Sequence, residues 1–308
     1  MTLAQPIGEW PVTGGTGQGA MPGILTQDEK AMKPVTEFDR EMEVASQLAR
    51  EAGDVILRIY ATDFPVDYKA KNDPVTEADR LASRVIVAGL RREFPNDMVV
   101  SEEESISPLA PVPDRVWYVD PLDGTHEFIK RNGEFAVMIG LAVAGSARLG
   151  VVFRPVTAEL FSGIVGQGAW LEAKDPKCPL RVASAIDSSR LRLASSRSHR
   201  HCLMDGLCRR LGIREEYRVG SVGIKVGMVV TRQADIYLEP SAMTKAWDSC
   251  APEAILRAAG GRMTDMTGAS LHYSPHDLQN RRGLVAANGA CHERVISEIT
   301  EFVREGIR

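Results

Sequence analysis

The sequence has few features of a secreted, membrane-embedded or nucleic-acid-binding protein. Its cysteines number five, an odd count, and none stands in a C-x-x-C arrangement, which favours reduced thiols over a disulfide framework. The 37 basic and 41 acidic side chains give a net charge of −4 without a strongly basic block. A groove that holds a nucleic acid polymer by bulk charge is therefore not expected, whereas a small basic pocket for a phosphorylated ligand is compatible with this balance.

Long apolar runs and a targeting signal are also missing. The longest apolar runs, such as Ala136 to Val143, have the length of a strand and are far too short to span a bilayer, so no membrane insertion is expected. The stretch from Met1 to Met32 lacks a basic start followed by an apolar run, and it is rich in Gly, Pro and Thr. We expect residues 1–35 to form a flexible tail and the protein to be soluble and cytoplasmic.

What is present indicates a layered protein with helices and strands. At 308 residues, the chain is long enough for two substructures or one large layered domain. Apolar residues recur at helical spacing over residues 37–60, and a second helix is expected after Asp79, beyond a predicted loop that contains Lys69 and Lys71. Residues 135–171 contain closely spaced strand-like runs, which predict an antiparallel meander. We expect an α+β half over residues 36–178 and, where strands and helices alternate, an α/β half over residues 179–308.

Two carboxylates follow a predicted buried strand at residues 116–119. Asp120 and Asp123 occur where Pro121 and Gly124 force the chain to turn. The residues from Thr125 onward resemble a helix start, which leaves backbone N–H groups able to bind an anion. Hard cations take oxygen ligands, so this arrangement suits a phosphate bridged by metal ions. For an isolated D-x-x-D-G-T segment, a polar turn whose aspartates only cap a helix is the favoured alternative.

Other acids stand at neighbouring element ends. A short strand at residues 98–100 ends before Glu102 and Glu103, and pairing it with residues 116–119 would bring these acids near Asp120. Carboxylates so crowded repel one another, and a divalent cation would resolve the repulsion. A solvated acidic loop is the alternative. Thr76 with Asp79 has the form of a capping box, and Asp248 can be explained as a helix N-cap.

The basic residues Arg197 and Lys225 lie in the second half and admit two interpretations. They are either exposed charges or contacts to phosphate oxygens, the arginine by a bidentate fork and the lysine as a point charge. His199 alone is weak evidence for either.

Taken together, the segments Glu102-Glu103, Asp120 to Thr125 and Trp247-Asp248, in this order, resemble the inositol monophosphatase superfamily of magnesium-dependent, lithium-sensitive phosphatases. The likeness covers residues 37–304. Residues 127–135, 196–199 and 247–256 are most similar to its CysQ-like branch, the 3'(2'),5'-bisphosphate nucleotidases of sulfur metabolism.

The resemblance implies a layered αβαβα sandwich of the inositol monophosphatase and fructose-1,6-bisphosphatase type, with two or three Mg²⁺ ions. It implies that the metal ligands are Glu102, Asp120, the carbonyl of Leu122, Asp123 and Asp248, with Asp79 holding a further, weaker ion. Asp79 and Thr125, together with Glu103, would orient or deprotonate the attacking water. Gly124 and Thr125 would hold the phosphate by their N–H groups, and the nucleotide would face Ser196, Arg197, His199, Ser221 and Lys225.

The expected reaction is hydrolysis of adenosine 3',5'-bisphosphate to AMP and phosphate, with the corresponding phosphosulfate as a further substrate. The expected partner is this small phosphorylated molecule, and a homodimer is among the expected assemblies. The alternatives are an inositol monophosphatase or fructose-1,6-bisphosphatase activity at the same centre, or a regulatory protein that only binds phosphorylated ligands. His126 replaces a usual Lys or Arg of the branch, and Glu239 replaces an Arg of several relatives. Glu239 would repel a bisphosphate unless it faces elsewhere or is paired.

Overall fold

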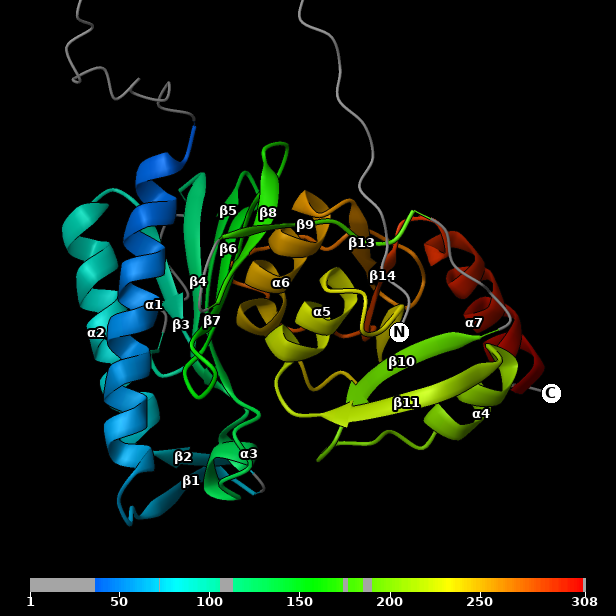
Figure 1. Ribbon diagram of the computed structural model, residues 1–308, viewed down its shortest axis with the longest axis horizontal. Coiled ribbons are helices and arrows are strands. Elements are labelled where there is room, and N and C mark those ends of the chain that lie inside the picture. The colour runs from blue at the N-terminus through cyan, green and yellow to red at the C-terminus, as the bar shows by residue number, and fades with distance from the viewer. Residues whose placement is uncertain (1–36, 72, 106–112, 174–176, 185–189, 307–308) are drawn as a thin grey trace, which may run out of the picture. The chain divides into compact units, whose positions relative to one another are not determined.

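The computed structural model describes residues 37–71, 73–105, 113–173, 177–184 and 190–306, all within one compact unit that begins at Glu37. The expected flexible tail, residues 1–35, lies outside the described residues. In this described part, one sheet of seven strands and one of five strands organise the chain, and a two-stranded hairpin lies beside them (Figure 1). The expected boundary between two halves near residue 178 stays a prediction.

The seven-stranded sheet has the strand order β3-β4-β5-β6-β7-β8-β9. Its strands are β3 (Met98–Ser101), β4 (Arg115–Asp123), β5 (Ala136–Val143), β6 (Ser146–Arg154), β7 (Glu159–Ile164), β8 (Gly168–Glu172) and β9 (Cys178–Leu180). The pair β3 and β4 is parallel, and every later pair is antiparallel. The predicted antiparallel meander is therefore confirmed, and so is the parallel pairing that brings the acidic loop after β3 beside the end of β4.

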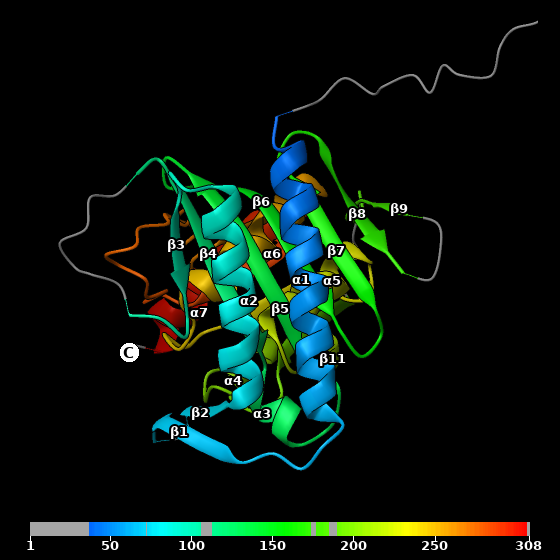
Figure 2. The ribbon, with the colours of Figure 1, turned by 90° about the vertical axis from the view of Figure 1, so that its left-hand side faces the viewer.

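Two long helices, α1 (Asp39–Tyr60) and α2 (Glu77–Glu93), cover one face of this sheet (Figure 2). The buried stripe of α1, which includes Leu48 and Ile56, packs on Val137 and Ile139 of β5. Because alternate residues of a strand point to opposite faces, Met138 belongs to the core on the other side of the sheet. Both faces of β5 are covered, so its sequence is apolar almost throughout.

On the opposite face lie α5 (Val222–Val230) and α6 (Ala246–Ala258), which form a layer between the two sheets. Three glycines of adjacent strands, Gly140, Gly150 and Gly163, are register partners beneath α6. A Cβ atom on Gly150 would lie 2.1 Å from the carbonyl oxygen of Ala251. The glycines therefore permit the helix backbone to touch the sheet, and this close approach fixes the position of α6.

The five-stranded sheet has the order β11-β10-β12-β14-β13. Its strands are β10 (Leu191–Ser196), β11 (Ile213–Val219), β12 (Ile236–Glu239), β13 (Gly261–Thr264) and β14 (Leu284–Asn288). The helices α4 (Met204–Arg210) and α7 (His292–Gly306) cover its outer face. The strands β11, β10 and β12 are parallel, whereas β14 is antiparallel to both β12 and β13. The expected αβαβα fold is confirmed, with a mixed second sheet.

One element was predicted wrongly. The stretch that contains Lys69 is not a loop, because β1 (Val66–Ala70) and β2 (Asp73–Thr76) form an antiparallel hairpin. Most β1 side chains are exposed, so the strand lacks the alternation of apolar and polar residues that marks a half-buried strand. The short strands β9 and β13 also went unpredicted.

None of the helices that the structure describes is both long enough and apolar enough to cross a membrane. Cys202, Cys208, Cys250 and Cys291 are thiols outside any disulfide bond.

Candidate active site

The end of β4 places two aspartates at a turn. The pairing of β4 with β5 shifts register between Asp120 and Asp123, and both carboxylates are buried. Gly124 follows with a φ of 104° and is the N-cap of the short helix α3 (Thr125–Ile129). A Cβ atom there would lie 2.9 Å from the carbonyl oxygen of Glu134, so both the backbone angle and the space require glycine. The predicted strand, turn and helix start are confirmed.

A third aspartate reaches the same point from α6. Asp248 is the third residue of that helix, and one of its carboxylate oxygens accepts a hydrogen bond of 2.6 Å from the N–H of Lys245. Lys245, not Asp248, is the N-cap. Carboxylate oxygens of Asp120, Asp123 and Asp248 all lie within 4.8 Å of one another. The seven-stranded sheet and α6 therefore bring Asp248 to two aspartates that are more than 120 positions earlier in the sequence.

Glu102 lies next to this cluster because β3 runs parallel to β4. Its N–H donates to the carbonyl oxygen of Val119, at 3.1 Å, directly before Asp120. The side chain of Lys69, on the β1–β2 hairpin, donates to Glu102 at 2.9 Å and to Glu103 at 2.6 Å. Burial lowers the pKa of Lys69, but the charges of the two glutamates outweigh that effect and raise it. No sequence signal indicated that Lys69 would hold the two acids.

The charges of this cluster oppose one another. Burial, and then the charges of Glu102, Asp123 and Asp248, raise the pKa of Asp120. Burial and the charges of Asp123 and Glu102 likewise raise the pKa of Asp248. A cage of carboxylate oxygens suits a hard divalent cation, which would compensate this repulsion. The residues present therefore fit the metal centre that the sequence predicted.

Asp79 and Thr125 form a hydrogen-bonded pair beside the cage. One carboxylate oxygen of Asp79 accepts from the N–H and the hydroxyl of Thr76, at 2.8 and 2.7 Å, so the capping box exists. The other oxygen accepts from the hydroxyl of Thr125 at 2.9 Å, and the same hydroxyl lies 3.3 Å from the carbonyl oxygen of Leu122. Burial raises the pKa of Asp79. Asp79 therefore caps α2 and also faces the site.

Ser221 and Lys225 approach the cage from α5. Asp123 accepts hydrogen bonds from the Ser221 hydroxyl at 2.5 Å and from the N–H of Gly223 at 3.1 Å. Ser221 holds a φ of 54°, an uncommon value for a residue with a side chain, directly before the helix. Lys225 is buried. Burial lowers its pKa, while Asp123 and Glu239 act in the opposite direction.

The other predicted substrate residues lie at the end of β10 and on the segment that follows it. The guanidinium of Arg197 makes a two-pronged contact with Glu134, at 2.7 and 2.6 Å. The Ser196 hydroxyl accepts from the N–H of His199 at 3.1 Å. The ring of His199 meets the ring of His126 edge-on, with centroids 5.1 Å apart. Arg197 is thus already paired, a contact for which the sequence offered no signal.

Glu239 at the end of β12 is paired. Its carboxylate is buried and accepts from the N–H and the hydroxyl of Ser241, at 3.1 and 2.7 Å. It is also among the acids that raise the pKa of Lys225. We expected Glu239 to repel a bisphosphate unless it is paired, and these contacts pair it.

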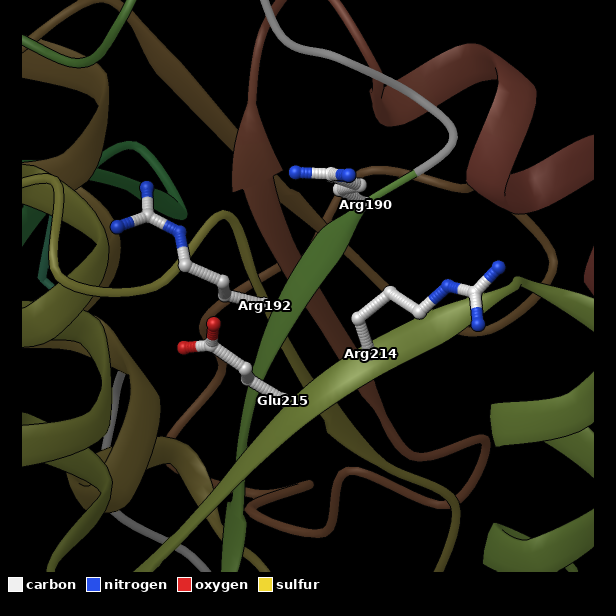
Figure 3. A pocket seen from close by; sticks show the side chains of 4 residues that line it. All are labelled: Arg190, Arg192, Arg214 and Glu215. Atoms are coloured by element: carbon white, nitrogen blue, oxygen red, sulfur yellow. The ribbon is translucent and has the colours of Figure 1, made fainter.

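A separate hollow of about 760 Å³ lies at the opposite end of β10 and β11 and is lined by Arg190, Arg192, Arg214 and Glu215. Its arginines do not converge, because Arg214 points away from Arg192 and Glu215 (Figure 3). Arg192 is paired with Asp235 at 2.8 Å, and Glu215 accepts from Tyr217. The candidate active site is therefore the acidic cluster at the end of β4.

The fold and the site define an αβαβα protein with a cage of three carboxylates, two of them buried and one partly buried. The model of the inositol monophosphatase family matches residues 35–304. The 3'(2'),5'-bisphosphate nucleotidase CysQ of Escherichia coli K12 is 40% identical over 235 residues, which cover 75% of this chain and 93% of that protein. The chain therefore belongs to the inositol monophosphatase family.

Solved structures agree with this assignment. The CysQ of Bacteroides thetaiotaomicron is 32% identical, with a TM-score of 0.70, and the match covers 82% of this chain and 98% of that one. The extragenic suppressor protein suhB of Bartonella henselae is 26% identical, with a TM-score of 0.73, and the match covers 85% of this chain and 99% of that one.

Proposed function

We propose that this protein is a magnesium-dependent phosphomonoester hydrolase that removes the 3'-phosphate of adenosine 3',5'-bisphosphate and yields AMP and phosphate. The observation that carries this proposal is the convergence of Asp120, Asp123 and Asp248 within 4.8 Å. The name of the E. coli relative, a 3'(2'),5'-bisphosphate nucleotidase, supports the choice of substrate. The corresponding adenosine phosphosulfate is a further proposed substrate of the same site.

The oxygen ligands suit two or three Mg²⁺ ions. Glu102, Asp120, the carbonyl of Leu122, Asp123 and Asp248 are the proposed ligands, with Asp79 near a further ion. When bound, such ions lower the pKa of a coordinated water and neutralise charge on the phosphoryl group, so no protein nucleophile is required.

The protein's own groups position and deprotonate the attacking water. The Thr125 hydroxyl donates a hydrogen bond to Asp79 at 2.9 Å, which leaves the lone pairs of the Thr125 oxygen able to accept a hydrogen bond from the attacking water. Burial raises the pKa of Asp79 and of Glu103, so either carboxylate holds a proton more readily than an exposed one. The N–H groups of Gly124 and Thr125, at the start of α3, have no acceptor within the helix and are proposed to hold phosphate oxygens.

The nucleotide is proposed to lie against Ser196, Arg197, His199, Ser221 and Lys225. Burial, and then the neighbouring His126, lower the pKa of His199, so its ring is neutral near pH 7. A neutral imidazole offers a flat face and one hydrogen-bond acceptor to a base or sugar. We further propose that the protein acts in the cytoplasm on free nucleotides, as a monomer or a homodimer.

The test is a comparison of turnover on three substrates with magnesium, with and without lithium. The purified protein should release phosphate from adenosine 3',5'-bisphosphate with a higher kcat/KM than from inositol 1-phosphate or fructose 1,6-bisphosphate. Preference for an inositol or sugar phosphate would contradict the proposed substrate but not the metal centre. A complete lack of phosphate release from all three would favour a protein that only binds phosphorylated ligands.

A further inference from the structure

The acidic site is surrounded by cations, and most of them already have acidic partners. Lys69 contacts Glu102 and Glu103, at 2.9 and 2.6 Å. Arg197 is bound to Glu134 by two hydrogen bonds. The positive charges of these two side chains are therefore largely compensated before any substrate arrives.

Two more lysines also lie close to acidic side chains. Lys225 is buried and feels the charges of Asp123, Glu239, Glu127 and Asp248, so acids already surround its ammonium. Lys130, at the end of α3, donates to the hydroxyl of Ser198 at 2.9 Å, and that hydroxyl donates to Glu127 at 2.5 Å. A second phosphate would have to compete with these carboxylates for each of the four cations.

Lys245 differs from these four. Within the part of the chain that the structure describes, its ammonium forms neither an ion pair nor a hydrogen bond, whereas that of Lys225 donates to the carbonyl oxygen of Val219 at 3.5 Å. The Lys245 ammonium lies over the ring of Trp247, 4.8 Å from the centroid. Its backbone is fixed, because its N–H donates to Asp248 at 2.6 Å and its carbonyl oxygen accepts from Asn280 at 2.9 Å. The side chain is half-buried, and its charge helps to lower the pKa of Asp248. It is a positioned cation beside the cage whose ammonium is not held by a hydrogen bond or an ion pair in the described part of the chain.

We propose that Lys245 recognises the second phosphate of the substrate, the one that is not transferred. This inference rests on the proposed function, because it requires a substrate with two phosphates. The metal ligands are committed to the phosphate that is hydrolysed, and the second phosphate needs a separate counter-charge. A lysine suits this role, since its ammonium is a compact point charge on a flexible stem. Lys245 then supplies the positive charge for the second phosphate, which the acidic Glu239 cannot supply.

The experiment compares Lys245→Met with the wild type on adenosine 3',5'-bisphosphate and on adenosine 3'-phosphate, which has the same scissile ester but no second phosphate. The loss of one charged contact should lower kcat/KM for the bisphosphate by about 10- to 100-fold and leave kcat/KM for the monophosphate within about twofold. Lys245→Arg should retain most of the preference. Lys177→Met is the matched control, because Lys177 also lies over a tryptophan, Trp170, at 5.2 Å, on β8.

An equal loss on both substrates would overturn the proposal, because Lys245 would then act through Asp248 and the metal centre. An unchanged preference for the bisphosphate would overturn it as well. If Lys245→Met does not fold, as judged by thermal unfolding, Lys245→Gln takes its place under the same criteria. If the wild type hydrolyses neither adenosine phosphate, the proposed function itself fails, and that result is seen before any variant is measured.

Discussion

Asp120 and Asp123 are three residues apart, yet their surroundings differ. Asp123 accepts hydrogen bonds from Ser221 and Gly223, and the charge of Lys225 lowers its pKa against the larger effect of burial. Asp120 accepts one described hydrogen bond, from the N–H of Leu122 at 3.0 Å, and otherwise faces acids. We therefore expect removal of the charge to have different effects on catalysis and stability at the two positions.

Asp123→Asn should reduce catalysis while leaving the fold intact. The amide keeps the size of the side chain but removes a ligand charge, and losses of single electrostatic groups in active sites cost about 10²–10³ in kcat. The measurement is phosphate release from adenosine 3',5'-bisphosphate with magnesium. Asp277→Asn, at an exposed position, is the control and should retain full activity. Normal turnover of Asp123→Asn would show that the metal ligands are assigned wrongly.

Asp120→Asn should stabilise the protein when no divalent cation is bound. Because burial and three neighbouring acids oppose its charge, a neutral amide of the same shape removes repulsion and raises the free energy of unfolding. Urea unfolding in the presence of a chelator measures this effect. Added magnesium should stabilise the wild type more than the variant. A variant that is less stable than the wild type in chelator would contradict the electrostatic account.

At the scale of single residues, the sequence revealed the acids better than their partners. Asp120 and Asp123 could be predicted because turn residues and strand ends are local features, whereas the role of Asp248 was implied by the family resemblance. The contacts of Lys69 with Glu102 and of Arg197 with Glu134 join residues 33 and 63 positions apart, and nothing local marks them. The sequence also could not show that Lys225 is buried among acids, since its helix has apolar residues on every side.

At the scale of elements, the site depends on how closely α6 approaches the seven-stranded sheet. Gly140, Gly150 and Gly163 form a row across β5, β6 and β7, and α6 carries Asp248 over that row. Pro252 stands inside the same helix. The position of Asp248 relative to Asp120 is therefore set by backbone contact between α6 and the sheet.

Gly150→Ala should displace α6 from the sheet. The added methyl group would meet the carbonyl oxygen of Ala251 at 2.1 Å, and backbone cannot yield as a side chain can. Overpacking of this kind costs about 1–3 kcal/mol, and the shift of Asp248 should also weaken magnesium binding. Urea unfolding and magnesium titration measure the two effects. Gly227→Ala is the control: its methyl group would meet only the Phe161 ring tip, at 3.2 Å, and little change is expected.

Element prediction succeeded where periodicity is strong and failed where it is weak. The helical repeat of residues 39–60 and the short strands from Ala136 onward gave α1 and the meander. The β1–β2 hairpin shows no such repeat, because its β1 side chains are mostly exposed. The antiparallel placement of β14 depends on long-range pairing, which local patterns do not encode.

At the scale of the whole molecule, we expect one buried histidine to make stability depend on pH. His292, at the start of α7, shares a hydrogen bond of 2.9 Å with Thr264 on β13, and its Nδ1 has no described partner. Burial, and then the charge of Arg262, lower the pKa of His292 to about 4. An unfolded histidine has a pKa of about 6.5, so the unfolded chain takes up a proton first as the pH falls.

The free energy of unfolding should therefore decrease as the pH falls from about 6.5 to about 4. His292→Gln removes this titration, so the variant should lose less stability than the wild type between about pH 7.5 and about pH 5. Urea midpoints at the two pH values measure the difference. His276→Gln, at an exposed position, should behave like the wild type. Equal pH dependence in wild type and His292→Gln would rule out this histidine as the cause.

The layered architecture was predicted mainly from the family resemblance and less from the pattern of apolar residues. Alternating elements indicate sheets covered by helices, but the αβαβα order depends on which faces pack together. That order places the ends of β3 and β4 against the start of α6 and so assembles the acidic cage. The site is thus a property of the whole unit, since its three aspartates come from a strand of one sheet and from the helix layer between the sheets.

The most direct measurement is an anomalous difference map from a crystal soaked in Mn²⁺, which can replace Mg²⁺ among oxygen ligands. We predict a strong peak bounded by the carboxylates of Asp120, Asp123 and Asp248, with Glu102 beside it. Density without a peak, and with these side chains turned to separate regions of solvent, would contradict the metal centre on which the proposed function depends.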